Sequence, residues 1–311
     1  MKFLYAILST LFVSMATSAF AGDGNTQCAL AEGLTLQVLG SGGPIADDGR
    51  ASTAYLLWVN GLSRFQIDAG GGSFVRFGQT GARFEDLSHI AISHFHTDHS
   101  TDLVALLKSG YFSNRRRGLS ISGPAGGGDY PGMGTYLDRM IGPENGAYAY
   151  LAGYLDGSAG LVELEWGEID SKIEKASLVY TDPGDEIEIT AMGVPHGPVP
   201  ALAYRIRIGR QSIVFAGDHN GGSKALVDFA REVDILVMHL PVPEGTVGVG
   251  RKLHAPPGVI GDIAASTGAR KLVLSHFMAR SLKNMETSLA EIRSRYTGSL
   301  VIADDLACIG F

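Results

Sequence analysis

The chain has 311 residues, of which 45% are hydrophobic, and this is enough for one large domain with a sizeable core. Its formal net charge of −7 argues against a polyanionic partner, because proteins that bind nucleic acids usually carry a basic stripe. The basic run Arg115-Arg116-Arg117 is interpreted as a solvated loop. We therefore expect no nucleic-acid polymer among the partners.

The N-terminal residues are typical of an export signal. Lys2 gives a positive start, Phe3 to Met15 is largely apolar, and Ala19-Phe20-Ala21 has the small-x-small pattern of a cleavage site. We expect residues 1–21 to be a signal peptide cleaved after Ala21. The apolar stretch is short for a membrane span and none that is longer follows, so we expect residues 22–311 to be a single soluble domain, periplasmic or secreted, with no membrane insertion after cleavage.

The first half of residues 22–311 predicts strands and helices in alternation. Apolar alternation between turn residues predicts strands over 34–39, 54–59, 65–68, 90–92 and 119–122, and a helix over 103–107. The segment near 126–174 is rich in Gly, Tyr and Pro and is interpreted as an insertion that covers one side of the site. Its aromatic residues either wall an aryl pocket or pack against the scaffold: Tyr148, Tyr150, Tyr154 and Trp166.

The run Ser93-His94-Phe95-His96-Thr97-Asp98-His99 places three imidazoles and a carboxylate directly after a predicted strand. Imidazole nitrogens and carboxylate oxygens are the ligands that zinc and iron prefer. In α/β proteins the carboxyl ends of strands are where sites are usually built. A tight turn here can direct His94 and His96 to one metal ion, and Asp98 and His99 to a second one.

The second half carries three more residues of this kind. Strands are predicted over 176–180, 186–192, 201–208, 212–216, 235–239, 271–275 and 299–303, with helices over 258–266 and 285–296. His196, Asp218 and His276 each lie at or just past the end of a strand. Strands come first and strand-helix units follow in both halves, which predicts an αββα sandwich of two face-to-face mixed sheets flanked by helices.

The order His94-x-His96-x-Asp98-His99, then His196, Asp218 and His276, resembles the metallo-β-lactamase superfamily of hydrolases. The resemblance implies that His94, His96 and His196 bind a first metal ion. It also implies that Asp98, His99 and His276 bind a second one and that Asp218 bridges the two. Asp68, in the Ile-Asp-Ala-Gly segment, resembles the buried aspartate that orients the site in this family; capping of the following helix is compatible with that role. Two Zn²⁺ ions are expected, with iron or manganese possible in one position.

Several segments resemble the ribonuclease Z-like branch, which also includes exported arylsulfatases and cyclic-nucleotide phosphodiesterases. They include Leu39-Gly40-Ser41-Gly42-Gly43-Pro44, Phe215-Ala216-Gly217-Asp218, and His254 ahead of a glycine-containing helix. In that branch the residue matching His254 donates a proton or hydrogen bond during catalysis. The resemblance therefore implies that Asp98 and His254 are catalytic and that a hydroxide bridging the metals is the nucleophile.

The chain also departs from ribonuclease Z. His196 and Asp218 are too close in sequence to enclose a long RNA-binding arm, and His239-Leu240-Pro241-Val242 replaces the His-Glu-Ala-Thr motif. With the export signal and the acidic charge, these departures favour a dinuclear hydrolase of small sulfate or phosphate esters over tRNA processing. Two alternatives stay open: a lactone or carboxylic ester hydrolase of the same fold, and a non-catalytic periplasmic zinc-binding protein.

Some residues keep more than one interpretation. Cys28 and Cys308 either pair in an oxidising compartment or remain two free thiols. His89 is interpreted as structural, and His219 as either structural or in contact with substrate. His239 has a substrate-contacting, a ligand-orienting or a merely structural role. A homodimer is possible by resemblance only.

Overall fold

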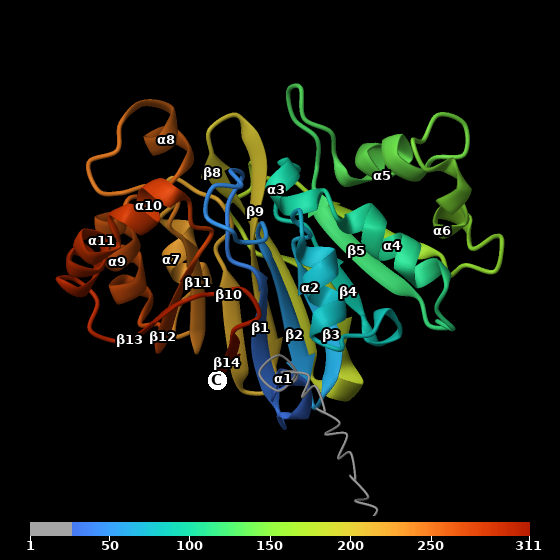
Figure 1. Cartoon of the computed structure of the whole chain (residues 1–311), viewed down its shortest axis with the longest axis horizontal. Coiled ribbons are helices and arrows are strands. Elements are labelled where there is room, and N and C mark those ends of the chain that lie inside the picture. The colour runs from blue at the N-terminus through green and yellow to red at the C-terminus, as the bar shows by residue number, and fades with distance from the viewer. Residues whose placement is uncertain (1–26) are drawn as a thin grey trace, which may run out of the picture.

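Two seven-stranded sheets face each other and carry helices on their outer surfaces (Figure 1). The computed structural model describes residues 27–311, so the predicted signal peptide, residues 1–21, lies outside the described residues. The predicted αββα sandwich is confirmed. Within the described part of the chain, no helix has both the length and the apolar character needed to cross a membrane.

The first sheet contains both parallel and antiparallel strands. It is built from the first six strands of the chain and the last one. In spatial order its strands are β14 (Cys308–Gly310), β1 (Leu34–Gly40), β2 (Ala54–Val59), β3 (Leu62–Ile67), β4 (His89–Ala91), β5 (Leu119–Pro124) and β6 (Leu164–Ile169). The parallel pairing of β3 with β4 brings the carboxyl ends of both strands to one edge. The strand β6 lies within the segment expected to be an insertion, so that segment contributes to the sheet as well as covering it.

The second sheet has the same number of strands. In spatial order they are β13 (Ser299–Ile302), β12 (Lys271–Ser275), β11 (Ile235–His239), β10 (Gln211–Phe215), β9 (Val199–Ile208), β8 (Ile187–His196) and β7 (Ser177–Asp182). The strands β10, β11 and β12 are parallel, and β8 pairs with β9 in an antiparallel hairpin. As a result, the ends of β8, β10, β11 and β12 meet at one edge of the sandwich.

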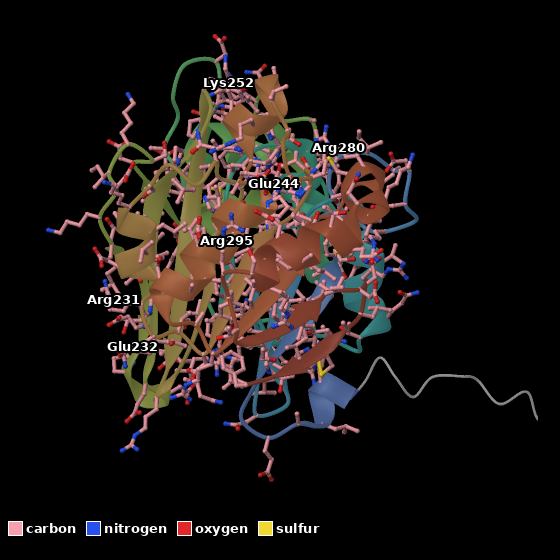
Figure 2. All side chains as sticks on the ribbon, turned by 90° about the vertical axis from the view of Figure 1, so that its left-hand side faces the viewer. Arg231, Glu232, Glu244, Lys252, Arg280 and Arg295 are labelled. Atoms are coloured by element: carbon pink, nitrogen blue, oxygen red, sulfur yellow. A yellow bond between two sulfur atoms is a disulfide. The ribbon has the colours of Figure 1, made fainter. Side chains whose placement is uncertain are left out.

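Helices cover both outer faces. Beside the first sheet lie α2 (Ser73–Gln79), η1 (Phe84–Asp86), α3 (Thr97–Ser100), α4 (Leu103–Tyr111), α5 (Met133–Ile141), η2 (Ala149–Leu151) and α6 (Gly153–Asp156). Beside the second lie α7 (Ala225–Phe229), α8 (Gly248–Leu253), α9 (Pro257–Thr267), α10 (Ala279–Lys283) and α11 (Met285–Arg293). Figure 2 looks onto this second layer, where Arg295 forms ion pairs with Asp262 of α9 and Glu291 of α11.

The alternation of side chains along a strand explains why β2 is buried on both faces. Tyr55 and Leu57 point into the core between the two sheets, which they share with Phe215 of β10. Leu56 and Trp58 point the other way, into the core under α2 and α4. A third apolar cluster lies between the second sheet and its helices. Burial of this apolar surface is the main force that holds the layers together.

The two cysteines form a disulfide in the structure. Cys28 of α1 (Gln27–Leu30) is bonded to Cys308 of β14, across a sequence separation of 280 residues (Figure 2). The sequence left open whether the two cysteines are bonded or free, and in the structure they are bonded. The bond fastens α1 to the edge of the first sheet, at the end of the sandwich opposite to α3 and α8.

Candidate metal centre

The turn that carries His94 to His99 is fixed by Asp68, which directly follows β3. The Asp68 carboxylate accepts two hydrogen bonds from Ser93. The backbone N–H of Ser93 donates to Oδ1 at 2.7 Å, and its hydroxyl donates to Oδ2 at 2.9 Å. The Nδ1 atom of His99 lies 2.8 Å from the same carboxylate. Asp68 does not cap α2, whose N-cap is Gly72. Asp68 therefore fixes the turn that carries His94 to His99, which is the role of a carboxylate that orients a metal ligand.

Close backbone packing positions the same turn from the other side. A Cβ atom on Gly70 would lie 2.1 Å from the carbonyl oxygen of Asp98, so a side chain there would push the turn away. Asp68 and His276 both have left-handed backbone conformations, with φ of 58° and 57°. Such conformations are uncommon outside glycine and cluster at functional sites.

Four predicted residues come together in a first group: His94, His96, His196 and Asp218. One ligand-type atom from each of them lies within 4.8 Å of the others. The Nε2 atom of His94 and the Nδ1 atom of His96 are 3.0 Å apart, and the Nε2 atom of His196 is 3.6 Å from Oδ2 of Asp218. His196 Nδ1 lies 2.9 Å from the carbonyl oxygen of Leu253, while its buried Nε2 has no hydrogen-bond partner. A histidine with Nδ1 donating to a carbonyl presents the Nε2 lone pair to a cation.

A second group lies next to the first and consists of His99, Asp218, His239 and His276. The Nε2 atoms of His99 and His276 are 3.1 Å apart. Asp98 also faces this pair, because its Oδ2 atom lies 3.2 Å from His276 Nε2 and 3.5 Å from His99 Nε2. The structure thus brings together all of the residues expected around the second metal ion and adds His239.

Asp218 lies between the two groups, and its carboxylate is close to imidazole nitrogens of both. Its Oδ2 atom is 3.9 Å from His94 Nε2 in the first group and 3.7 Å from His99 Nε2 in the second. Its Oδ1 atom is 3.4 Å from His276 Nε2, in the second group. A carboxylate in this position would be able to contact a cation in either group.

His239 orients Asp218, which sequence reasoning left undecided. Its Nδ1 atom lies 2.6 Å from Asp218 Oδ1, and its Nε2 atom lies 3.0 Å from the hydroxyl of Tyr55. Both ring nitrogens are therefore engaged within the protein. Tyr55 belongs to the other sheet, 184 positions away in the sequence, and no local sequence pattern predicts its contact with His239.

The electrostatics of the cluster favour positive charge. Burial lowers the pKa of His94 well below its ordinary value, so this ring is neutral at pH 7. Burial also lowers the pKa of His99, but the carboxylates of Asp68, Asp98 and Asp218 raise it to about 9. Burial raises the pKa of Asp218, yet His276, His254 and His99 hold it well below its usual range. Buried carboxylates that stay ionised among imidazoles suit a divalent cation.

The donor set therefore fits transition-metal ions. It offers ionised carboxylates and imidazoles such as those of His94 and His196, whose pKa values burial lowers, and these are the ligand types of zinc, iron and manganese sites. The unpartnered Nε2 atom of buried His196 supports this fit, because buried polar atoms rarely lack a partner.

His254 lies at the mouth of the cluster. Its Nδ1 atom is 3.7 Å from Asp218 Oδ2 and has no hydrogen-bond partner. Burial lowers its pKa to about 3, so the ring is neutral at pH 7. It lines a cavity of about 370 Å³ together with Pro44, Phe95, Asp98 and Leu253. We call this the central cavity.

Two other histidines lie outside the cluster. His219 accepts a hydrogen bond at Nδ1 from the backbone N–H of Gly221 and does not line the central cavity. The ring nitrogens of His89 lie 2.9 and 2.8 Å from the hydroxyls of Ser120 and Ser122, within the first sheet. These contacts agree with a structural interpretation of both residues.

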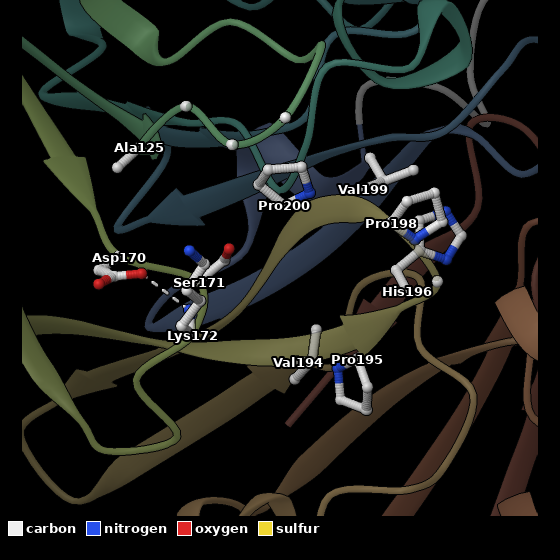
Figure 3. Close-up of a pocket in the computed structure, with 14 residues that line it drawn as sticks. Ala125, Asp170, Ser171, Lys172, Val194, Pro195, His196, Pro198, Val199 and Pro200 are labelled. Carbon is white, nitrogen blue, oxygen red and sulfur yellow. Dashed lines mark hydrogen bonds between the residues drawn. The ribbon is translucent and has the colours of Figure 1, made fainter.

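A second cavity, of about 420 Å³, opens beside His196 (Figure 3). The glycine loop 126–128 and the turn Asp170-Ser171-Lys172 form one wall, and the β8–β9 hairpin from Val194 to Pro200 forms the other. Figure 3 shows His196 at one end and Lys172 at the other. This cavity extends the accessible surface around the first group and brings a basic residue to it.

Comparison with known proteins identifies relatives of the whole chain. A family model described as "Beta-lactamase superfamily domain" matches residues 63–277. A ribonuclease Z from Methanosarcina acetivorans is 25% identical over 302 residues, covering 88% of this chain and 96% of that protein. The human short-form tRNase Z has 18% identity, a TM-score of 0.66 and coverage of 89% and 98%. The metallo-β-lactamase fold protein YhfI from Bacillus subtilis has 18% identity, a TM-score of 0.68 and coverage of 88% and 98%.

These relatives correct the expected substrate. The prediction of small sulfate or phosphate esters, with no nucleic-acid polymer as partner, is wrong, because the relatives that match nearly end to end are named ribonuclease Z. The lactone and zinc-scavenger alternatives are set aside with it. The net charge of the chain is a poor guide to its substrate, because it sums the whole surface and does not describe the residues around one site.

The basic run at 115–117 was also misread in part. The guanidinium of Arg115 is buried and donates to the carbonyl oxygen of Phe84 at 2.9 Å. Arg115 is thus a structural residue and not part of a solvated loop. The comparisons and the ligand groups together support a metal-dependent hydrolase.

Proposed function

Because the chain belongs to the β-lactamase superfamily, we propose that it is a metal-dependent hydrolase that cleaves phosphodiester bonds in RNA. The observation that carries this proposal is the position of Asp218, whose carboxylate lies 3.4 to 3.9 Å from imidazole nitrogens in two adjacent groups of ligand-type atoms. Sites with two metal ions are a common solution for displacement at phosphorus. Relatives named ribonuclease Z support RNA as the substrate class.

The two groups indicate which residues would hold the cations. His94, His96 and His196 would hold one cation, and Asp98, His99 and His276 the other, with Asp218 available to both. His239 is left out because both of its ring nitrogens are engaged within the protein. Zinc suits a site rich in imidazole, with iron or manganese as an alternative in one position. When bound, the cations supply Lewis acidity and make water a competent nucleophile near neutral pH.

Residues of the chain itself supply positioning and hydrogen bonding. His254 lines the central cavity with a free Nδ1 atom and is neutral at pH 7, so it hydrogen-bonds to a phosphate oxygen or to the leaving oxygen. Asp68 contacts His99 and His239 contacts Asp218, so these two residues orient the proposed ligands. Neither of the two reaches the central cavity, so both act as positioning residues.

Basic side chains near the site suit a polyanionic substrate despite the net charge. Lys172 lines the cavity beside His196, and exposed Lys252 precedes His254 by two residues. Positive side chains near a phosphate track contribute most of the sequence-independent affinity for nucleic acids. The charge that matters here is local, and Lys172 and Lys252 contribute to it together with Asp170, which lines the same cavity as Lys172.

We further propose that residues 1–21 are a signal peptide and that the enzyme acts outside the cytoplasm. The Cys28–Cys308 disulfide supports this location, because disulfides persist mainly in oxidising compartments. If the enzyme acts outside the cytoplasm as proposed, its substrate is RNA that reaches the periplasm or the surrounding medium.

The test measures cleavage of a labelled single-stranded RNA of about 30 nucleotides by the zinc-loaded protein, with and without a chelator. The matched variants are Asp98→Ala and Asp228→Ala; Asp228 is an exposed acid of α7 that belongs to neither ligand group and does not line the central cavity. We expect cleavage that is abolished by the chelator and by Asp98→Ala and unaffected by Asp228→Ala. Absence of cleavage, or cleavage that survives Asp98→Ala, would refute the proposal.

A further inference from the structure

We propose that an aromatic cavity between α4 and the α5–η2 segment binds one unpaired nucleobase of the RNA strand whose scissile phosphate lies at the metal centre. This inference rests on the proposed function and makes it more specific. It assigns single-stranded RNA as the substrate, held through base stacking beside the catalytic site.

The cavity has a volume of about 510 Å³, within the usual range for small-ligand sites. Its walls are largely apolar and aromatic, and include Phe95, Val104, Tyr136, Met140, Tyr148 and Tyr150. Figure 1 shows α4 and α5 side by side at the end of the sandwich where α3 begins. We call this space the aromatic cavity.

The inner part of the aromatic cavity is rigid. The rings of Phe95 and Tyr136 stack with centroids 4.6 Å apart and an interplanar angle of 16°. The Tyr136 hydroxyl donates a hydrogen bond to the carbonyl oxygen of Ser100 at 3.0 Å, which fixes the orientation of the ring. A preformed aromatic wall of this kind binds a planar ligand without the entropic cost of ordering side chains.

The outer part of the aromatic cavity presents open ring surface. Tyr148 is 40% exposed and Tyr150 is 56% exposed, and their rings meet edge to face with centroids 6.4 Å apart. Exposed aromatic side chains on which bases stack are the feature that proteins use to bind single-stranded nucleic acids. Bases in an RNA duplex are not available for such stacking, so the cavity favours an unpaired strand.

A cation completes this surface. The Nζ atom of Lys108 lies 4.6 Å from the ring centroid of Tyr150, and 4.4 and 4.6 Å from those of Tyr111 and Phe112. Across residues 27–311, Lys108 forms no ion pair with a carboxylate. An ammonium group held among rings and not neutralised suits the phosphate next to a stacked base.

The aromatic cavity adjoins the central cavity. Phe95 and Thr97 line both it and the central cavity. Phe95 lies between His94 and His96 in the sequence, so the stacking wall and the proposed ligands belong to one turn. We infer that a strand with a phosphate in the central cavity reaches the aromatic cavity with a neighbouring base. The shared residues Phe95 and Thr97 favour a nucleobase of the same strand over an unrelated apolar partner.

The test compares the variant Tyr148→Ala/Tyr150→Ala with the conservative variant Tyr148→Phe/Tyr150→Phe. Trp166→Ala is the matched control, because Trp166 is 50% exposed on β6 and does not line the aromatic cavity. The substrates are a short single-stranded RNA, the same RNA with an abasic residue at each position flanking the mapped cleavage site, and the corresponding duplex. The readouts are kcat and KM for each substrate.

We expect the alanine variant to raise KM for the intact single strand by roughly tenfold or more with little change in kcat, because stacking contributes about 1–3 kcal/mol per base. We also expect one abasic position to remove the difference between the alanine variant and the wild type. The phenylalanine and Trp166→Ala variants should match the wild type. An unchanged KM in the alanine variant, or an equal loss on every abasic RNA, would overturn the inference.

The two proposals fail in different ways. If the wild type cleaves no RNA, the proposed function fails, and fluorescence anisotropy with a labelled single-stranded RNA then tests the aromatic cavity alone. Affinity that falls in the alanine variant supports the cavity as a nucleobase site, and equal affinity refutes it. If the wild type cleaves RNA but the alanine variant is unaffected, only the further inference fails.

Discussion

The Oδ1 atom of Asp218 lies 2.6 Å from Nδ1 of His239, and this is the first of two contacts that link the Asp218 carboxylate to the other sheet. The link continues through His239 Nε2, which lies 3.0 Å from the hydroxyl of Tyr55 on β2. Since Asp218 faces both ligand groups, its orientation determines whether they can act together. The packing of the two sheets thus contributes directly to the geometry of the site.

The first prediction concerns Tyr55→Phe, which removes the hydroxyl that meets His239. We expect metal affinity to fall, but by less than the roughly tenfold that follows loss of a group bonded directly to a ligand, because Tyr55 acts on Asp218 through His239. The measurement is competition with a chromophoric chelator. Tyr204→Phe is the matched control, because this buried hydroxyl contacts Ser122 and Ile92 and not the cluster. Equal losses in both variants would show that the effect is general destabilisation.

The second prediction concerns His254→Ala. We expect the rate of RNA cleavage to fall by about 100-fold or more, the usual contribution of a group that transfers or shares a proton. Metal content, measured by atomic emission, should stay unchanged, because His254 belongs to neither ligand group. A loss of metal in parallel with the loss of rate would instead place His254 among the ligands.

The third prediction concerns the pH dependence of stability. Burial lowers the pKa of His89 to about 3, whereas the pKa of an unfolded histidine is near 6.5. Between these values the unfolded chain binds the extra proton, so the stabilisation is complete above about pH 6.5 and is lost as the pH falls toward 3. His89→Gln should lower the slope of unfolding free energy against pH by up to about 1.4 kcal/mol per unit. Urea unfolding between pH 4.5 and 7 measures it, and identical slopes would contradict the assignment.

The fourth prediction concerns the disulfide. The variant Cys28→Ser/Cys308→Ser should lose about 2–5 kcal/mol of unfolding free energy, because the bond closes a very long loop. RNA cleavage at 25 °C should be unaffected, since the bond lies at the end of the sandwich opposite to the site. Unfolding in guanidinium chloride gives the first quantity. An unchanged free energy would mean that the bond adds nothing to stability.

The sequence predicted the fold well because the ligand-type residues follow regular apolar strands. His196, Asp218 and His276 could be placed at one edge since each closely follows a strand end, and parallel strands bring their carboxyl ends together. The strand β6 was missed because its central residues are exposed and lack apolar alternation. The strand β14 was missed because it has only three residues.

Contacts between sheets and the nature of the substrate were harder to predict. The pairing of Tyr55 with His239 depends on how two sheets pack, and no local pattern encodes it. The aromatic residues near 126–174 divide in the structure: Tyr148 and Tyr150 line a cavity, whereas the buried Tyr154 donates its hydroxyl to the carbonyl oxygen of Leu107. Spacing alone cannot separate these two roles.

The most direct test of the central claim measures RNA cleavage while zinc is titrated into the metal-free protein, with Asp218→Asn as the comparison. The claim is that two cations sharing Asp218 hydrolyse RNA. It predicts that the wild-type rate rises to a plateau at two equivalents of zinc, and that Asp218→Asn remains nearly inactive at any zinc concentration. A plateau at one equivalent, a wild-type rate in Asp218→Asn, or no cleavage at saturating zinc would contradict the account.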